Sequence, residues 1–114
     1  MIARIWRGLT PVSKSEAYLK YLEETGLKDY RSTEGNRGAF ILHRVQQDYA
    51  EFTLVSFWDS WEAIRRFAGE DLNRAVYYPQ DDTFLVNKTP VVYHYEVPFA
   101  NLADALKIDA YALA

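Results

Sequence analysis

The strands that this sequence predicts are apolar on both faces, and this constrains the fold more than any other feature. In the segment 51–58, Leu54 points to one face while Val55 and Phe57 point to the other. A strand with one face in water should instead alternate apolar with polar residues. Both faces of the sheet therefore need cover. Four segments rich in branched and aromatic residues are predicted as strands: 1–9, 39–46, 51–58 and 91–97.

Two predicted helices separate these strands. The first follows the capping-box pattern from Ser13 to Glu16, and Gly26 can end it. The second begins at the stretch from Asp59 to Glu62, which repeats the pattern of a cap followed by an acidic residue, and Gly69 can stop it. The order strand, helix, strand, strand, helix, strand predicts an α+β fold of the ferredoxin-like βαββαβ type. In it, both helices cover one face of a four-stranded antiparallel sheet.

The other face needs a different cover. A second copy of the same sheet is the economical one, because most soluble oligomers are symmetric dimers. The rival is a terminal helix, predicted over 101–113, that folds back over its own sheet. We expect the homodimer through the sheet face. Shorter helical pieces are also predicted at 72–76 and 81–85. The chain is then one domain over 1–98, with a C-terminal helical tail over 99–114.

Composition excludes several functional classes. Thirteen Lys and Arg against sixteen Asp and Glu give a net charge of −3, so the chain lacks the basic footprint of a nucleic-acid-binding protein. The absence of cysteine excludes disulfide scaffolds and thiolate metal sites. The longest stretches without a charged residue have seven residues, too few for a membrane span or a signal-peptide core. We therefore expect a cytoplasmic protein without a membrane or nucleic-acid partner.

Aromatic residues make up 16% of the chain, enough to build a core or to line a cavity for a flat ligand. Several of them lie in stretches that resemble the antibiotic biosynthesis monooxygenase-like family of the dimeric α+β barrel superfamily. The resemblance runs from about residue 2 to residue 98. The stretches that carry it are 5–8 (IWRG), 35–38 (GNRG), 57–64 (FWDSWEAI), 67–71 (FAGED), 75–79 (AVYYP) and 92–97 (VYHYEV).

The resemblance implies a homodimer and a small hydrophobic or aromatic ligand between sheet and helices. Some members oxidise flat polycyclic phenols without metal or flavin, through a deprotonated substrate that reacts directly with oxygen. A monooxygenase without a bound cofactor is therefore the leading hypothesis. The haem-degrading branch carries an Asn, a Trp and a His where this chain has Trp6 or Arg7, Phe67, and Val76 or Tyr77. Haem degradation is not expected.

Three residues are predicted as catalytic. His94 and His43 are the only histidines, and either could act as a general base or donate to an oxyanion. A core or interface histidine remains the alternative for each. Arg4 could hold a phenolate, although an ion pair with Glu96 or another acid is the commoner role for such a residue. A metal site is not predicted, because the two histidines lack ligand spacing even with Glu96 nearby.

Four aromatic residues are predicted to bind the substrate, and each could instead fill the core or the dimer rim. Trp6 shares a strand face with Arg4, and Trp58 precedes the second helix. Phe67 lies within that helix, and Tyr78 lies in an irregular segment of the kind that often covers a site. The alternative function for the whole chain is a non-catalytic small-molecule-binding or structural dimer module.

Overall fold

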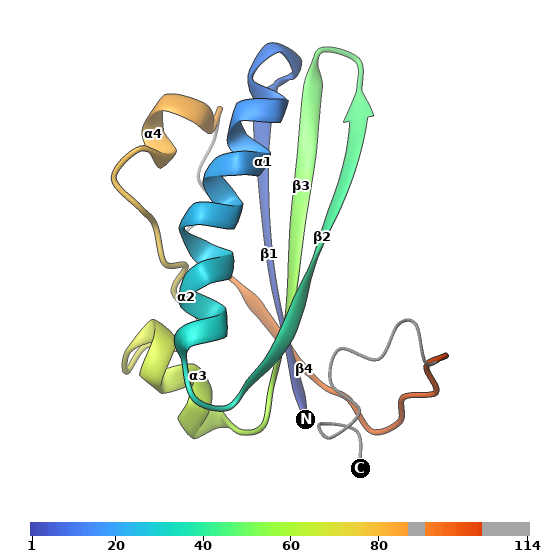
Figure 1. Cartoon of the computed structure of the whole chain (residues 1–114), viewed down its shortest axis with the longest axis vertical. Helices are drawn as coiled ribbons and strands as arrows, with labels where there is room; N and C mark the ends of the chain where they lie inside the picture. Colours follow the sequence, from blue (N-terminus) through green and yellow to red (C-terminus); the bar gives the residue numbers. More distant parts are fainter. Residues whose placement is uncertain (87–90, 104–114) are drawn as a thin grey trace.

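The computed structural model describes residues 1–86 and 91–103, and it confirms the ferredoxin-like α+β fold (Figure 1). Four antiparallel strands form one sheet in the order β2-β3-β1-β4. The strands are β1 (Ile2–Pro11), β2 (Asn36–Gln46), β3 (Tyr49–Trp58) and β4 (Tyr93–Glu96). The helical elements are η1 (Val12–Lys14), α1 (Ser15–Glu24), α2 (Gly26–Ser32), α3 (Trp61–Ala68) and α4 (Asp81–Phe84).

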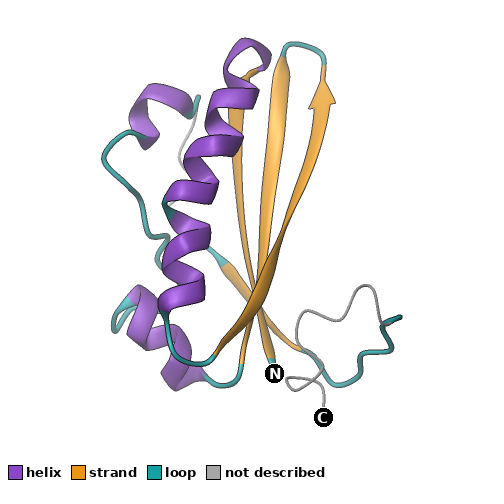
Figure 2. Cartoon of the chain, viewed as in Figure 1, coloured by secondary structure: helices purple, strands orange, loops and turns teal. Residues whose placement is uncertain are grey.

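All the α-helices lie on one side of the sheet, and the core fills the space between the two layers (Figure 2). The strand register sets this core. Leu54 of β3 lies opposite Trp6 of β1 and Ile41 of β2, and all three point toward the helices. Largely or fully buried apolar residues from the helices complete the core: Tyr18, Leu22, Tyr30, Ala63 and Ile64.

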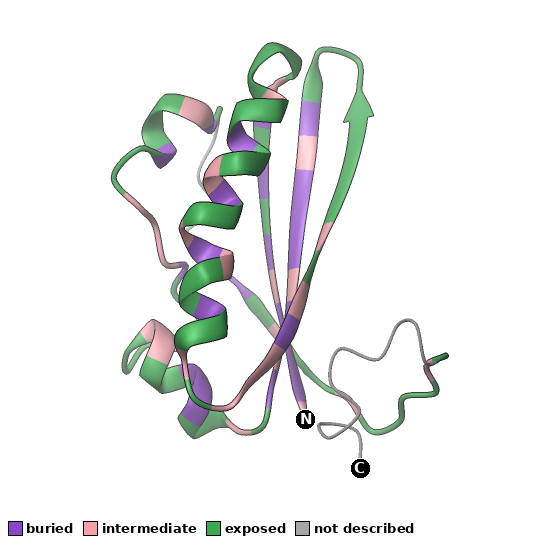
Figure 3. Cartoon of the chain, in the orientation of Figure 1, coloured by how far each residue is buried: buried purple, intermediate pink, exposed green. Residues whose placement is uncertain are grey.

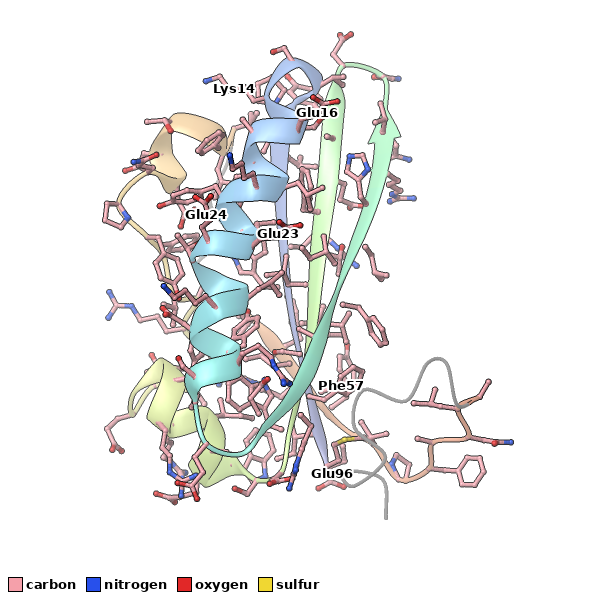
Figure 4. The ribbon with its side chains drawn as sticks, viewed as in Figure 1. Lys14, Glu16, Glu23, Glu24, Phe57 and Glu96 are labelled. Atoms are coloured by element: carbon pink, nitrogen blue, oxygen red, sulfur yellow. The ribbon has the colours of Figure 1, made fainter. Side chains whose placement is uncertain are left out.

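The opposite face of the sheet carries the second apolar surface that the sequence predicted, and the described residues leave much of it exposed (Figure 3). We call it the open face. At its N-terminal end along β1, an apolar half consists of Ala3, Ile5, Phe40, Val55, Phe57, Tyr93 and Tyr95. Tyr93 and Tyr95 of β4 are 62% and 57% exposed. Figure 4 labels Phe57 on this side, away from the helices.

The second predicted helix begins in the predicted capping stretch 59–62 and ends at Gly69, and the structure identifies Ser60 as the cap. The Ser60 side chain accepts a hydrogen bond from the Ala63 amide at 3.2 Å, and Gly69 ends α3 with φ = 86°. Just before β2, the backbone at Gly35 (φ = 93°) passes close to α3, and a Cβ atom on Gly35 would lie 2.4 Å from the Ala63 Cβ. Only glycine fits at this close approach.

The first helix differs from the prediction at both ends. A turn of 3₁₀ helix precedes it, and no side chain caps α1, so Ser13 is not the cap. Gly26 does not stop it either. The chain bends at Thr25, whose hydroxyl donates to the Tyr21 carbonyl at 2.7 Å, and helix resumes as α2 from Gly26 to Ser32.

Further along the chain, the structure contradicts one of the two predicted short helices and confirms the other. Residues 72–76 are not helical: Asn73 accepts from the Val92 amide at 2.9 Å, and Arg74 pairs with Val91 as an isolated bridge. The helix predicted from Asp81 is present as α4. The predicted terminal helix lies mostly outside the described residues. No described helix is long and apolar enough to cross a membrane.

Candidate functional site

Arg4 lies in the middle of β1 on the helix-facing side and is 2% exposed. Its Nη1 donates to the Leu72 carbonyl at 2.6 Å, and its Nη2 donates to the Arg74 carbonyl at 3.0 Å. Within the described residues Arg4 forms no ion pair, so the predicted ion pair with Glu96 or another acid is wrong. Its guanidinium instead fixes the irregular segment after α3 to the sheet.

His94 is the neighbour of Arg4 across the β1–β4 pair, and its Nε2 lies 2.9 Å from Arg4 Nη1. Because a guanidinium can only donate, Nε2 accepts, and the neutral ring carries its proton on Nδ1. Burial, and secondarily the Arg4 charge, lower the pKa of His94 to about 4. A histidine with this pKa and a hydrogen-bonded Nε2 is a weak general base at neutral pH.

Aromatic rings surround this pair. The Phe67 ring centroid lies 5.8 Å from Arg4 Cζ, and the Trp61 ring lies 5.3 Å from the His94 ring. Trp58 is fully buried and packs against Phe67, with its Nε1 donating to the Ser56 hydroxyl at 2.9 Å. Arg4, His94, Phe67 and Trp58 thus come together, but as a packed cluster.

The Arg4–His94 contact predicts a pH dependence of stability. The unfolded chain binds a proton on His94 near the ordinary pKa of about 6.5, whereas the folded chain binds it only near pH 4. Between these values the unfolded state holds more protons, so the free energy of unfolding must fall as the pH is lowered from 7 toward 4. Urea denaturation of wild type and His94→Gln across this range measures the effect. The variant should show a flatter profile than wild type, and equal slopes for the two proteins would contradict the assignment.

His43 lies apart from this cluster, on β2 at the opposite edge of the sheet. It faces α1 and forms one wall of a groove of about 210 Å³ between α1 and β2. Its ring centroid lies 4.8 Å from that of Phe52, the residue opposite it on β3. Figure 4 shows Glu16 at the hairpin end of this groove. The other lining residues are Ser15, Leu19 and Ile41.

Trp6 and Tyr78 belong neither to the cluster around Arg4 and His94 nor to the groove between α1 and β2. The Trp6 ring covers Gly8, where a Cβ atom would lie 2.5 Å from its Cη2, and its Nε1 has no hydrogen-bond partner among the described residues. Tyr78 donates its hydroxyl to Asp29 Oδ2 at 2.6 Å, and burial and this hydrogen bond raise its pKa. It therefore holds the segment before α4 against α2. No group of three or more potential metal ligands occurs among the described residues.

Sequence reasoning missed the groove residues on α1, Leu19 above all, and the buried Tyr30 that packs between Trp58 and Phe67. The contact of His43 with Phe52 was missed as well. The predicted four-residue link at 47–50 pairs Gln46 with Glu51 and therefore places His43 opposite Leu54, whereas the structure pairs Gln46 with Tyr49 across a two-residue turn and His43 with Phe52. The position of the helix that completes the groove depends on tertiary packing and leaves no local signal.

No family model and no curated protein matches this chain, whereas solved structures do. A Bacillus cereus protein described as a candidate antibiotic biosynthesis monooxygenase matches with TM-score 0.63 and 16% identity, over 90% of this chain and 97% of that one. The heme-degrader MhuD of Mycobacterium tuberculosis, with two hemes in its active site, matches with TM-score 0.60 and 15% identity, over 89% and 99%. A further M. tuberculosis protein matches with TM-score 0.55 and 19% identity, over 91% and 97%. The chain therefore has the fold of the antibiotic biosynthesis monooxygenase-like proteins.

Proposed function

We propose that this chain is a monooxygenase that needs no bound cofactor and acts on a small, flat phenolic or aromatic substrate in the groove between α1 and β2. The observation that carries the proposal is an imidazole on the wall of an apolar groove between sheet and helices. His43 supplies the base, and Phe52, Ile41 and Leu19 supply flat and branched surfaces for a ring. Binding sites for small molecules combine such surfaces with few polar groups.

The chemistry that fits this arrangement starts with a proton transfer. His43 accepts a proton from a substrate whose anion is delocalised over an aromatic system. The electron-rich anion then reacts with oxygen at a ring CH₂ carbon: two C–H bonds break, one oxygen atom becomes a carbonyl, and the other leaves as water. The substrate itself supplies the electrons, so the step balances without a further reductant. The His43 proton returns in the water formed.

The groove limits the size of the substrate. Its volume of about 210 Å³ exceeds the roughly 150 Å³ of an apolar cavity that holds benzene. One substituted ring therefore fits within it, and further fused rings extend toward the open side. The volume is also below the roughly 300 Å³ at which small-molecule pockets usually begin. This small volume favours a second candidate function, which is a non-catalytic module that binds a small ligand.

Oxygen uptake separates these two functions. Anthrone has a flat ring system and an acidic CH₂ group, and we expect the wild-type protein to consume one oxygen molecule for each anthrone converted to anthraquinone. Uptake no faster than the buffer background, with anthrone bound, would support the binding module instead. If anthrone is neither oxidised nor bound, both proposals for the groove are wrong.

The apolar half of the open face is the surface that we propose for a homodimer. Tyr93 and Tyr95 on β4 and Phe40 on β2 expose large apolar areas at the two edges of this half, and Ile5 and Val55 lie between Tyr93 and Phe40 in the sheet. Contiguous exposed apolar surface of this kind marks an interaction site. A second copy supplies a matching surface by symmetry, because a two-fold interface pairs the same patch on both subunits.

Tyr93→Asp is expected to break this dimer. It introduces two unpaired carboxylates into an apolar interface and leaves the monomer core untouched, so the dissociation constant should rise about 100-fold or more. Sedimentation velocity at micromolar concentration measures it: wild type should sediment as a dimer of 13.3 kDa chains, and the variant as a monomer. Tyr49→Asp, on the same face but outside the apolar half, is the matched control. A monomeric wild type would refute the dimer.

A further inference from the structure

Beyond the apolar half, the open face changes character and becomes charged. We call this region the charged half; it consists of Arg7, Leu9, Leu42, Arg44, Glu51 and Thr53. Glu51 on β3 lies between two arginines, one on each neighbouring strand. Arg44 Nε donates to its Oε2 at 2.5 Å, and Arg7 Nε lies 3.7 Å from its Oε1. Arg7 Nε also donates to the Thr53 hydroxyl at 3.3 Å. The two guanidiniums are thus fixed on one carboxylate.

This cluster leaves both positive charge and hydrogen-bond donors unused. Two arginines and one glutamate carry a net charge of +1. Both arginines use only Nε for the contacts above, and within residues 1–86 and 91–103 their terminal nitrogens have no partner. Glu51 is largely buried, with 18% of its side chain exposed, whereas the arginine side chains are 65% and 61% exposed. The free donors therefore face outward from a fixed base.

Two hollows flank this cluster, and Glu51 lines both. One, of about 550 Å³, extends from Leu9 to Tyr49 and the hairpin turn. The other, of about 330 Å³, contains Arg7, Arg44 and Leu42, with His43 at its margin. Both volumes lie within the roughly 300–1,000 Å³ of small-molecule sites. The smaller hollow combines the apolar surface of Leu42 with the arginine donors, whereas the larger one adjoins the cluster only through Glu51.

A second protein copy is a poor occupant for this region. Covering the cluster would remove a net charge from water without an opposite charge to compensate it, because one half of the open face of a second copy is apolar and the other is positive. Exposed ion pairs contribute little to stability, roughly 0–1 kcal/mol, so stability alone gives the cluster little purpose. A small anion, in contrast, satisfies the free donors and the net charge together.

We propose that the charged half binds a small organic monocarboxylate with a flat apolar body. The carboxylate takes paired hydrogen bonds from the terminal nitrogens of Arg7 and Arg44, the geometry that guanidinium groups favour. The apolar body lies on Leu42, in the hollow that both arginines line. This site is on the face of the sheet opposite the α1–β2 groove, so it is additional to the function proposed above and does not depend on it.

The probe is 2-naphthoate, with 2-naphthylmethanol as a neutral ligand of the same ring system. Isothermal titration calorimetry at low salt should show the alcohol binding at least about tenfold more weakly, the usual difference when a charge-assisted hydrogen bond is lost. Arg7→Gln and Arg44→Gln should each weaken naphthoate binding by a similar factor. Arg65→Gln, an exposed arginine paired with Glu62 on α3, should not change it.

Two results would overturn the proposal. One is equal affinity for the acid and the alcohol, which would mean that the ring alone is recognised. The other is naphthoate binding that survives both arginine substitutions but is lost in Leu19→Ala, which would place the ligand in the groove instead. Because the substituted arginines are exposed, the variants should keep the wild-type urea midpoint, and this checks that each is folded. Oxygen uptake with anthrone should be unchanged in both.

Discussion

Replacing His43 by alanine is expected to slow oxygen uptake with anthrone by about 10²–10⁴-fold, the usual contribution of a positioned general base. The effect follows from the place of His43 on the groove wall, against the Phe52 ring and beside an open apolar surface. Its side chain is exposed, so its removal should leave the fold intact. The measurement is the initial rate in an oxygen electrode, with circular dichroism as the check on folding.

His94→Ala is the matched comparison, because these are the only two histidines in the chain. The Nε2 of His94 already accepts from Arg4, and its pKa of about 4 makes it a poor proton acceptor at neutral pH. This variant should keep most of the uptake rate but lose stability. If His94→Ala abolished uptake while His43→Ala did not, the reaction would belong to the Arg4 cluster and the groove assignment would be wrong.

Trp58→Ala is expected to lower the free energy of unfolding by about 3–5 kcal/mol, the range measured when a buried aromatic residue is truncated. Trp58 is 0% exposed, and it contacts the rings of Tyr30 and Phe67 at 5.8 and 5.7 Å. Its removal leaves a cavity between β3, α2 and α3. Domains of this size are stable by about 5–15 kcal/mol, so the loss is a large share of the total.

Urea denaturation measures this loss, with Trp61→Ala as the control. Trp61 is 40% exposed at the start of α3, and its truncation should cost about 1 kcal/mol or less. Trp58→Phe keeps most of the packing and removes the hydrogen bond to Ser56, so it should fall between the two. A loss below about 1 kcal/mol for Trp58→Ala would mean that its surroundings collapse to fill the space.

The strands could be predicted because each is a run of branched and aromatic residues bounded by turn residues, a pattern typical of strands that are apolar on both faces. The start and end of α3 were also readable, since Ser60 and Gly69 act through local backbone bonds. The errors have tertiary causes. Gly26 lies buried where the Tyr78 ring passes, about 4.0 Å from where its Cβ atom would be. Residues 72–76 give their carbonyls to Arg4 and Val92 instead of to a helix.

The candidate site was predictable only in part. Alternation placed Arg4 and Trp6 on the same face of their strand, and the structure shows that this face meets the helices. What alternation could not give is distance across the sheet: His43 and His94 occupy opposite edge strands, with β3 and β1 between them. Nor could it show that the acceptors of Arg4 are backbone carbonyls 68 and 70 residues away in sequence. Contacts to main-chain atoms leave no trace in residue type.

The place of β2 at the rim of the sheet has a consequence for handling the protein. Ten of its eleven residues pair with β3 on one side, and within the described structure the other side presents unbonded amide and carbonyl groups in a row. Such a row is a template on which further chains can assemble into aggregates. Arg44 on this strand belongs to a cluster with a net positive charge, and this charge repels a like strand. Neutralising Arg44 would weaken this protection and favour precipitation at high concentration.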